Sequence, residues 1–250
     1  MAKHAETGKN RTGIDISPMH SERMISGAKE YTGASGERVP SIAALQRQYI
    51  EEADPIGSVP VPGTLRGALK TGAQKATGKN PEVLLNKLGQ RLAFERGGVR
   101  LYDSVINKCE AIEDRQAVGP VTVDELQQIR DEELEHFRLL SDCIESLGAD
   151  PTAETPDADV GGVAAMGFRK VLNDPRTTLA QCLEMLLTLE LADNASWELL
   201  IRLADDMGLK DTSEQFQRAL EQEKEHLLTL RSWCEEMTLS AASQATEARH

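Results

Sequence analysis

Four carboxylates and two imidazoles recur in this 250-residue chain with a spacing that suits metal binding. Residues i and i+3 lie on one face of an α-helix, so a Glu-x-x-His pair can point both side chains toward one centre. A lone glutamate followed by such a pair, repeated once, is the arrangement that holds two iron or manganese ions in some helix bundles. The chain contains this arrangement as Glu95, Glu133 and His136, and then as Glu190, Glu223 and His226.

All six candidate ligands interrupt stripes of apolar residues that repeat at helical spacing. An ionised carboxylate buried in such a stripe costs several kcal/mol unless it is compensated. Two divalent cations would balance four carboxylates, whereas a buried ion-pair core is the structural alternative. We expect Glu133 with His136 to reach one ion and Glu223 with His226 the other. Lone glutamates Glu95 and Glu190 would be terminal ligands or bridges.

Five further positions lie close to these ligands in the sequence. Tyr102, two stripe positions after Glu95, is a candidate catalytic residue that relays an electron or donates a hydrogen bond, or else a core tyrosine. Asp193 and Asn194 are candidates for holding the outer ring nitrogens of the histidines, unless they face solvent. Gly97-Gly98 inside a helix indicates either a close helix approach or a local bulge.

Four long amphipathic segments carry these residues and predict an all-α fold. Aromatic residues make up only 4% of the chain, which disfavours a β-sandwich or β-barrel. Short links join the first and last pairs, while the link over Gly148–Asn173 is long enough to cross the length of a four-helix bundle and to include a short helix. The predicted helices run from Pro81 to about Glu110, from the cap Thr122 to a stop before Gly148, from near Asp174-Pro175 to a stop before Gly208, and from Asp211 to about Thr238.

Charge is distributed unevenly along the chain. Residues 1–80 contain 11 Lys+Arg and 8 Asp+Glu, which gives a charge of +3. Because the whole chain carries −13, residues 81–250 carry −16. We interpret residues 1–80 as an extended or partly disordered N-terminal arm with one short helix near Ser41–Glu52, residues 81–240 as the bundle, and residues 241–250 as a disordered tail. The arm ends in a basic stretch that either binds nucleic acid or lies on the acidic bundle: Arg66, Lys70, Lys75 and Lys79.

Several classes of protein are disfavoured by composition. The net charge of −13 argues against a nucleic-acid or anionic-membrane binder. No apolar run is long enough to span a membrane, and residues 1–10 lack a signal-peptide core, which favours a cytoplasmic protein. The cysteines form no C-x-x-C pair, which disfavours a zinc site, an iron–sulfur centre or a redox dithiol: Cys109, Cys143, Cys182 and Cys234.

Residues 81–238 resemble the ferritin-like superfamily, and specifically the ligand set of bacterioferritins, rubrerythrins and manganese catalases. The motifs are R-L-A-F-E-R at 91–96, E-E-L-E-H at 132–136, L-T-L-E-L at 187–191 and E-K-E-H at 223–226. Residues 150–181 and 193–200 are similar to a bacterial group of ferritin-like proteins with no assigned activity. The resemblance implies a ferritin-like four-helix bundle with a long crossover between its second and third helices.

This resemblance also implies a chemistry. Two iron ions, or alternatively two manganese ions, would bind, with no haem, and the site would react with Fe(II) and O₂ or H₂O₂ as a ferroxidase or peroxidase in oxidative stress. A manganese catalase activity is the alternative within the fold. A non-enzymatic interaction or DNA-protection role of residues 1–80 is the alternative outside it. Assembly into a homo-oligomer is open.

Overall fold

The computed structural model describes residues 18–31, 41–61 and 80–247, and these residues form helices and connecting loops without a β-strand. The predicted all-α class is therefore confirmed. The chain divides into two compact units, Met1–Pro55 and Ile56–His250. None of the described helices combines the length and the apolar content that a membrane-spanning helix needs.

The described residues of the first unit form two helices, whereas the sequence predicts one. Helix α2, Ile42–Glu52, is confirmed, and the hydroxyl of Ser41 caps it by accepting a hydrogen bond from the Ala44 amide. Helix α1, Pro18–Tyr31, was not predicted, because the sequence analysis identified one helical segment in this part of the chain, near Ser41–Glu52. The basic residues Arg66, Lys70, Lys75 and Lys79 lie outside the described residues.

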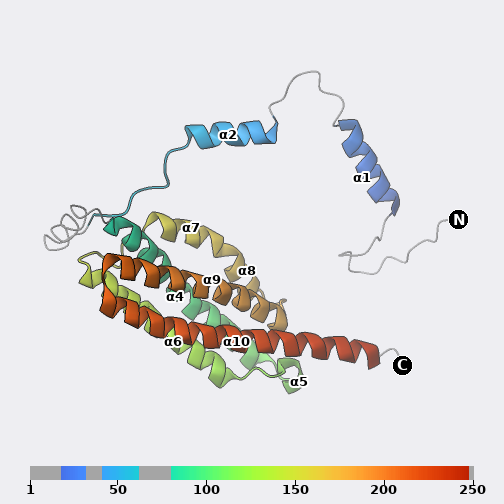
Figure 1. Cartoon of the computed structure of the whole chain (residues 1–250). Coiled ribbons are helices and arrows are strands. Elements are labelled where there is room, and N and C mark those ends of the chain that lie inside the picture. Colours follow the sequence, from blue (N-terminus) through green and yellow to red (C-terminus); the bar gives the residue numbers. More distant parts are fainter. Residues whose placement is uncertain (1–17, 32–40, 62–79, 248–250) are drawn as a thin grey trace. The chain divides into compact units, whose positions relative to one another are not determined.

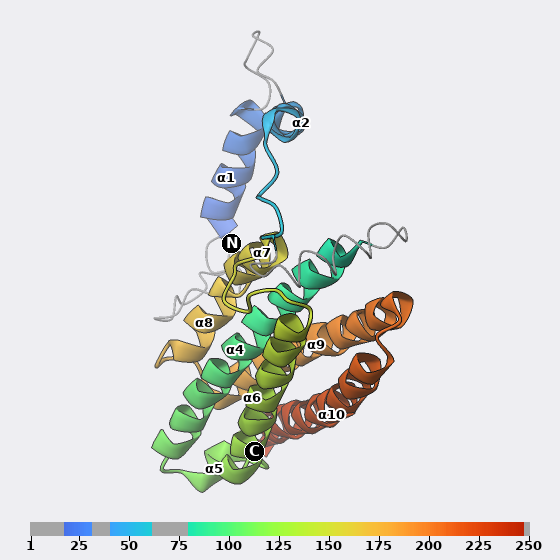
Figure 2. The same cartoon turned by 90° about the vertical axis from the view of Figure 1, so that its left-hand side faces the viewer.

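Four long helices dominate the second unit and lie side by side in both views (Figures 1 and 2). Helix α4 packs mainly against α6, and α9 against α10. Asn80 caps α4 as predicted, and Thr122 caps α6 by accepting a hydrogen bond from the Glu125 amide. Their bounds are Pro81–Ala111 for α4, Val123–Ser146 for α6, Leu179–Met207 for α9 and Lys210–Glu247 for α10.

Two predicted helix ends are wrong. Helix α9 begins at Leu179 rather than at Asp174, because Asp174 starts a turn that is closed by a hydrogen bond from the Thr177 amide, and Thr178 then forms a capping box. Helix α10 continues to Glu247, so residues 241–247 are helical and not a disordered tail. This last segment is rich in alanine and contains neither glycine nor proline, so nothing in it stops the helix.

The long connection between α6 and α9 contains two short helices, α7 at Pro156–Ala164 and α8 at Met166–Asn173. Both lie along α4 (Figure 2). The Asp157 amide donates to the side chain of Asn86, and the Asp157 carboxylate lies 2.7 Å from the Lys87 ammonium. A further short helix, α5 at Arg115–Val118, lies in the link between α4 and α6.

The buried apolar residues form two clusters, and each of the four long helices contributes to both. On α4, for example, Leu92 belongs to one cluster and Leu101 to the other, with Glu95 between them. The same holds for α10, where Leu220 and Leu230 lie on either side of the Glu223–His226 motif. A polar layer is therefore enclosed between two apolar layers.

Candidate metal centre

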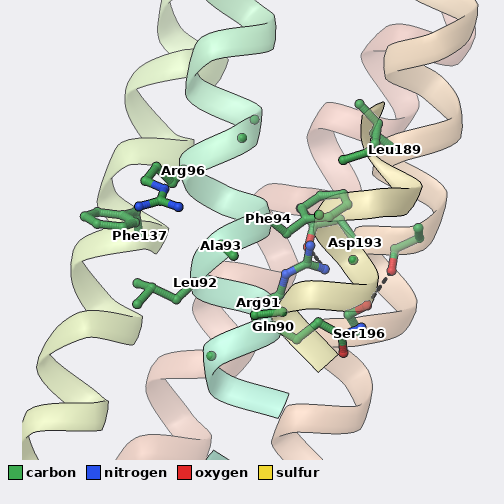
Figure 3. A pocket seen from close by; sticks show the side chains of 18 of the residues that line it. Gln90, Arg91, Leu92, Ala93, Phe94, Arg96, Phe137, Leu189, Asp193 and Ser196 are labelled. Atoms are coloured by element: carbon green, nitrogen blue, oxygen red, sulfur yellow. Dashed lines mark hydrogen bonds and ion pairs between the residues drawn. The ribbon is translucent and has the colours of Figure 1, made fainter. Parts of the chain in front are cut away.

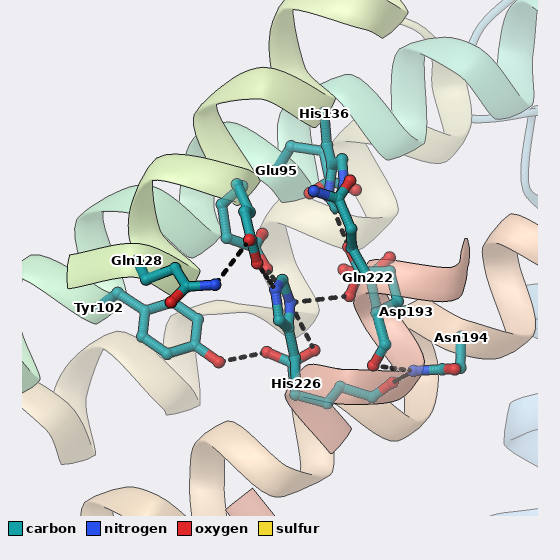
Figure 4. Close-up of polar contacts among 12 residues, drawn as sticks. Glu95, Tyr102, Gln128, His136, Asp193, Asn194, Gln222 and His226 are labelled. Atoms are coloured by element: carbon teal, nitrogen blue, oxygen red, sulfur yellow. Dashed lines mark hydrogen bonds and ion pairs between the residues drawn. The ribbon is translucent and has the colours of Figure 1, made fainter. Parts of the chain in front are cut away.

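The six candidate ligands meet in this polar layer, and all of them are buried. Glu190 is the most exposed, at 3% of its surface, while Glu95 and Glu223 are at 0%. Figure 4 shows Glu95, His136 and His226 directed into the space between the helices. The helices thus bring together side chains that are separated by up to 131 positions, from 95 to 226.

The ligand atoms form two overlapping groups, within each of which they lie within 4.8 Å of one another. Glu133 and Glu223 belong to both groups. One group is completed by Glu95 and His136, and the other by Glu190 and His226. This grouping is the geometry of two cation positions with two shared carboxylates, and it makes the lone glutamates the candidates for terminal ligands.

The buried polar atoms of this layer have few hydrogen-bond partners. Among the described residues, thirteen buried side-chain nitrogen and oxygen atoms lack one, and nine of them belong to the six candidate ligands. Native proteins satisfy the large majority of such atoms, so this concentration needs an explanation. The nine atoms are both carboxylate oxygens of Glu95, Glu133 and Glu223, one of Glu190, and Nδ1 of His136 and His226.

Both histidines direct Nδ1 toward the carboxylates. Nδ1 of His136 lies 2.7 Å from Oε1 of Glu223. Nδ1 of His226 lies 3.6 Å from one oxygen each of Glu133 and Glu223, and 3.8 Å from Oε2 of Glu190. The His136 ring also packs edge-on against the buried Trp197, with ring centroids 5.4 Å apart. Each imidazole is therefore aimed at one of the two groups.

The outer ring nitrogens are held by two residues that the sequence analysis omitted. Nε2 of His136 lies 3.0 Å from Oε1 of Gln222, and Nε2 of His226 lies 2.6 Å from Oε2 of Glu132. Each partner precedes the glutamate of one Glu-x-x-His motif and contacts the histidine of the other motif. Both helices have a hydrogen-bonding residue directly before the glutamate of the motif, Glu132 in one and Gln222 in the other. This shared position is the signal that could have identified them.

Asp193 and Asn194 do not make the contacts with the histidines that we expected. Asp193 lies on the side of α9 that faces α4, where its carboxylate is 2.6 Å from the Arg91 guanidinium. Arg91 also lies 3.1 Å from Glu95, which connects Asp193 to a candidate ligand. The Asn194 amide donates to the backbone carbonyls of Glu190 and Glu223, so it joins α9 to α10 beside the site (Figure 4).

Tyr102 and Gly98 complete the surroundings of the site. The buried Tyr102 hydroxyl donates a hydrogen bond to Oε1 of Glu190 (Figure 4), while its catalytic role stays a prediction. A Cβ atom at Gly98 would lie 2.5 Å from Oε2 of Glu133, so this glycine leaves room for a shared carboxylate. Close approach, one of the two readings of the glycine pair, therefore explains Gly98. A Cβ atom at Gly97 would meet nothing within 4 Å beyond its own helix and chain neighbours.

Burial and mutual repulsion disturb the acid–base equilibria of the carboxylates. Burial raises the pKa values of Glu95, Glu133 and Glu190 well above the ordinary value of 4.5, and neighbouring carboxylates raise them further. Burial also acts against ionised Glu223, but the neighbouring imidazoles of His136 and His226 outweigh burial and lower its pKa. Three of the four carboxyl groups thus favour the protonated form until a positive charge arrives.

Two further groups respond to the same surroundings. Burial opposes the charged form of His226, but Glu223, Glu190 and Glu132 raise its pKa to about 9. Burial raises the pKa of Asp193 to about 7, although Arg91 acts in the opposite direction. The layer therefore combines carboxylate and imidazole donors with a shortage of positive charge, which is the donor set and the charge balance that suit divalent cations.

A protein family described as "Domain of unknown function (DUF892)" matches residues 116–243. The matched region begins within α5 and ends within α10, and it includes five of the six candidate ligands, whereas Glu95 on α4 precedes it. Among curated proteins no significant match to this chain was found. Among solved structures no significant match was found either.

Proposed function

Because this chain belongs to the DUF892 family, whose description names no activity, we propose a function from the geometry of its polar layer. The four long helices form a ferritin-like bundle that binds two divalent metal ions, with iron as the physiological metal. The bound pair reacts with O₂ or H₂O₂, and the protein acts as a ferroxidase or peroxidase-type oxidoreductase in iron handling or oxidative stress. The resemblance of its motifs to ferritin-like proteins supports this assignment.

One observation carries the proposal, namely the nine buried ligand atoms without a hydrogen-bond partner. A structural ion-pair core would satisfy these atoms with cationic side chains. Among the described residues, Arg91 is the one arginine with an ion pair to a candidate ligand, and it is also paired with Asp193. Within the described part of the chain, the four carboxylates thus face the charge of Arg91 and of protonated histidine, which is less positive charge than two divalent cations would supply.

Each residue has a defined part in this proposal. Glu133 and Glu223 are shared by both positions, Glu95 with His136 completes one, and Glu190 with His226 completes the other. When iron is bound, the pair supplies two one-electron reducing equivalents to the oxidant. Carboxylates and imidazoles suit iron and manganese alike, so the identity of the metal is a matter for measurement.

The first test is metal content. We expect two iron ions per chain when the full-length protein is incubated with Fe(II) without oxygen, desalted and analysed for metals. Glu133→Gln should reduce this content and slow Fe(II) oxidation at least tenfold, because it removes a shared ligand from both positions. Glu135→Gln is the matched control, since Glu135 is exposed on the same helix. Equal metal content in the two variants would overturn the proposal.

The second test separates iron from manganese chemistry. Consumption of O₂ or H₂O₂ on addition of Fe(II) supports the ferroxidase or peroxidase proposal. Evolution of oxygen from H₂O₂ by the manganese-loaded protein, without such activity of the iron-loaded protein, would instead identify a manganese catalase. The DNA-protection alternative depends on Arg66, Lys70, Lys75 and Lys79, which lie outside the described residues, and stays a prediction.

A further inference from the structure

A large cavity lies along α4 and borders the candidate metal centre. Its volume is about 730 Å³, and its walls come from α4, α6, α9 and the connection that contains α7 and α8. Figure 3 shows Phe94 and Arg91 on the side of α4 that faces Asp193, and Arg96 near Phe137 on the side that faces α6. Glu133 and Glu190 line the cavity, so it extends to one edge of both cation positions.

The cavity is much larger than O₂ or H₂O₂ requires. A water molecule occupies about 30 Å³ in the liquid, and the two oxidants are only slightly larger. Pockets that bind organic ligands have volumes of about 300 to 1,000 Å³. At about 730 Å³, this cavity is in the range of organic ligands.

The lining of the cavity is unusually aromatic for this chain. The sequence contains four phenylalanines, and three of them, Phe94, Phe137 and Phe168, line the cavity. All three are half-buried, whereas Phe216 is fully buried in the core. Half-buried aromatic rings beside a polar site favour a partner with aromatic rings, because offset or edge-to-face ring pairs stabilise binding beyond simple burial.

Two basic groups at the inner wall have acidic partners within the protein. Arg91 is paired with Asp193, and Lys87 with Asp157. The arginines Arg96 and Arg169, which also contribute to the lining, are exposed. Apolar and aromatic side chains therefore define most of the inner surface, which favours a neutral ligand over an ionic one.

We propose that this cavity binds a neutral organic molecule with one or two aromatic rings, next to the shared carboxylate Glu133 and the terminal carboxylate Glu190. The molecule is an organic substrate or co-substrate of the centre, and in this respect the inference rests on the proposed function. Binding of the rings depends only on the cavity, so it can be measured without metal.

A pair of matched glycine variants tests the cavity. Gly97 lines the cavity, and a Cβ atom added there would meet nothing within 4 Å beyond its own helix and chain neighbours. Gly167 on α8 is equally open but does not line the cavity. We expect 2-naphthol to bind the full-length, metal-free protein at one site per chain in equilibrium dialysis. Gly97→Leu should lower the affinity at least tenfold, and Gly167→Leu should leave it unchanged.

Absence of saturable binding, or equal affinities of the two leucine variants, would overturn the inference. Thermal unfolding checks that both variants fold. If Gly97→Leu does not fold, Ala192→Phe fills the same cavity from α9 and takes its place. Loss of affinity in that variant supports the inference, and unchanged affinity contradicts it.

Proximity to the metal pair is tested by magnetic resonance. Paramagnetic Mn(II) in the centre should broaden the proton signals of bound 2-naphthol, and diamagnetic Zn(II) should not. Gly97→Leu should abolish the broadening while the metal content is unchanged. Naphthol binding without metal uptake would contradict the proposed function and support the cavity site. Metal uptake without naphthol binding would support the proposed function and contradict the cavity site.

Discussion

At the scale of single residues, each candidate histidine is held by a residue of the helix that carries the other histidine. Glu132 on α6 holds His226 of α10, and Gln222 on α10 holds His136 of α6. The two partners occupy equivalent positions in their helices but differ in charge, because one is a carboxylate and the other an amide. A carboxylate behind a ligating imidazole makes it a stronger donor. We therefore expect the two proposed cation positions to be inequivalent.

This asymmetry gives a prediction for Glu132→Gln. The amide retains a hydrogen-bonding atom beside His226 but removes the charge, so we expect about tenfold weaker binding at the position that contains His226. The other position should change less. Stepwise titration with Co(II), followed by its visible absorption, resolves the two events. Glu135→Gln is the control, and an equal decrease at both positions would contradict the asymmetry.

Gly98 gives a second prediction at this scale. Alanine should stabilise the helix by up to about 1 kcal/mol relative to glycine, yet its Cβ would displace the carboxylate of Glu133. We therefore expect Gly98→Ala to fold normally and to bind both metal ions at least tenfold more weakly. Gly97→Ala, with open space around it, should gain the helix stability and keep the affinity. Calorimetric titration compares the variants, and unimpaired binding by Gly98→Ala would show that Glu133 moves without penalty.

At the scale of elements, the connection between α6 and α9 is fixed to α4 by close packing. A Cβ atom at Gly89 would lie 2.6 Å from both Oγ1 and Cγ2 of Thr155, just before α7. The Thr155 side chain is short and β-branched, so it cannot move aside without moving its backbone. Gly89 is thus the position on α4 that allows the connection to approach.

We expect Gly89→Ala to destabilise the protein by about 1–3 kcal/mol through this steric overlap. Gly167→Ala, where the added methyl group meets nothing, should instead be neutral or stabilising by up to about 1 kcal/mol. Urea unfolding of the metal-free proteins measures both changes. If Gly89→Ala were as stable as Gly167→Ala, the contact with Thr155 would not constrain the connection.

At the scale of the whole molecule, the buried polar layer links stability to pH. In the metal-free protein, Glu95, Glu133 and Glu190 have pKa values above those of the unfolded chain, as does His226 at about 9. The folded state therefore binds more protons than the unfolded state between the ordinary carboxyl value of 4.5 and about 9. The free energy of unfolding must fall as pH rises through this window.

Metal binding should reverse this dependence, because cations replace the bound protons and favour the ionised ligands. We expect the metal-free protein to have a higher Tm at pH 6 than at pH 8.5, and the metal-loaded protein to gain most from its metal at pH 8.5. Scanning calorimetry of both forms measures the effect, and calorimetric titration in buffers of different ionisation enthalpy counts the released protons. A pH-independent Tm of the metal-free protein would contradict the raised pKa values.

The sequence by itself determined the helical class, the starts of α4 and α6, and the six residues that meet in the polar layer. These features depend on local capping chemistry and on side-chain spacing along one helix, which the chain order specifies directly. The start of α9 and the full length of α10 were missed, because an aspartate–proline pair resembles a helix start and an alanine-rich end carries no stop signal.

Only the tertiary structure decided which carboxylates are shared, which residues hold the imidazoles, and why Gly98 lacks a side chain. Glu133 lies in both groups because α6 faces α4 and α10 at one level of the bundle, and Glu132 reaches His226 across 94 positions of sequence. The cavity beside Phe94 likewise depends on how α7 and α8 cover α4. Such contacts result from the packing of separate helices, which periodicity within a single helix does not specify.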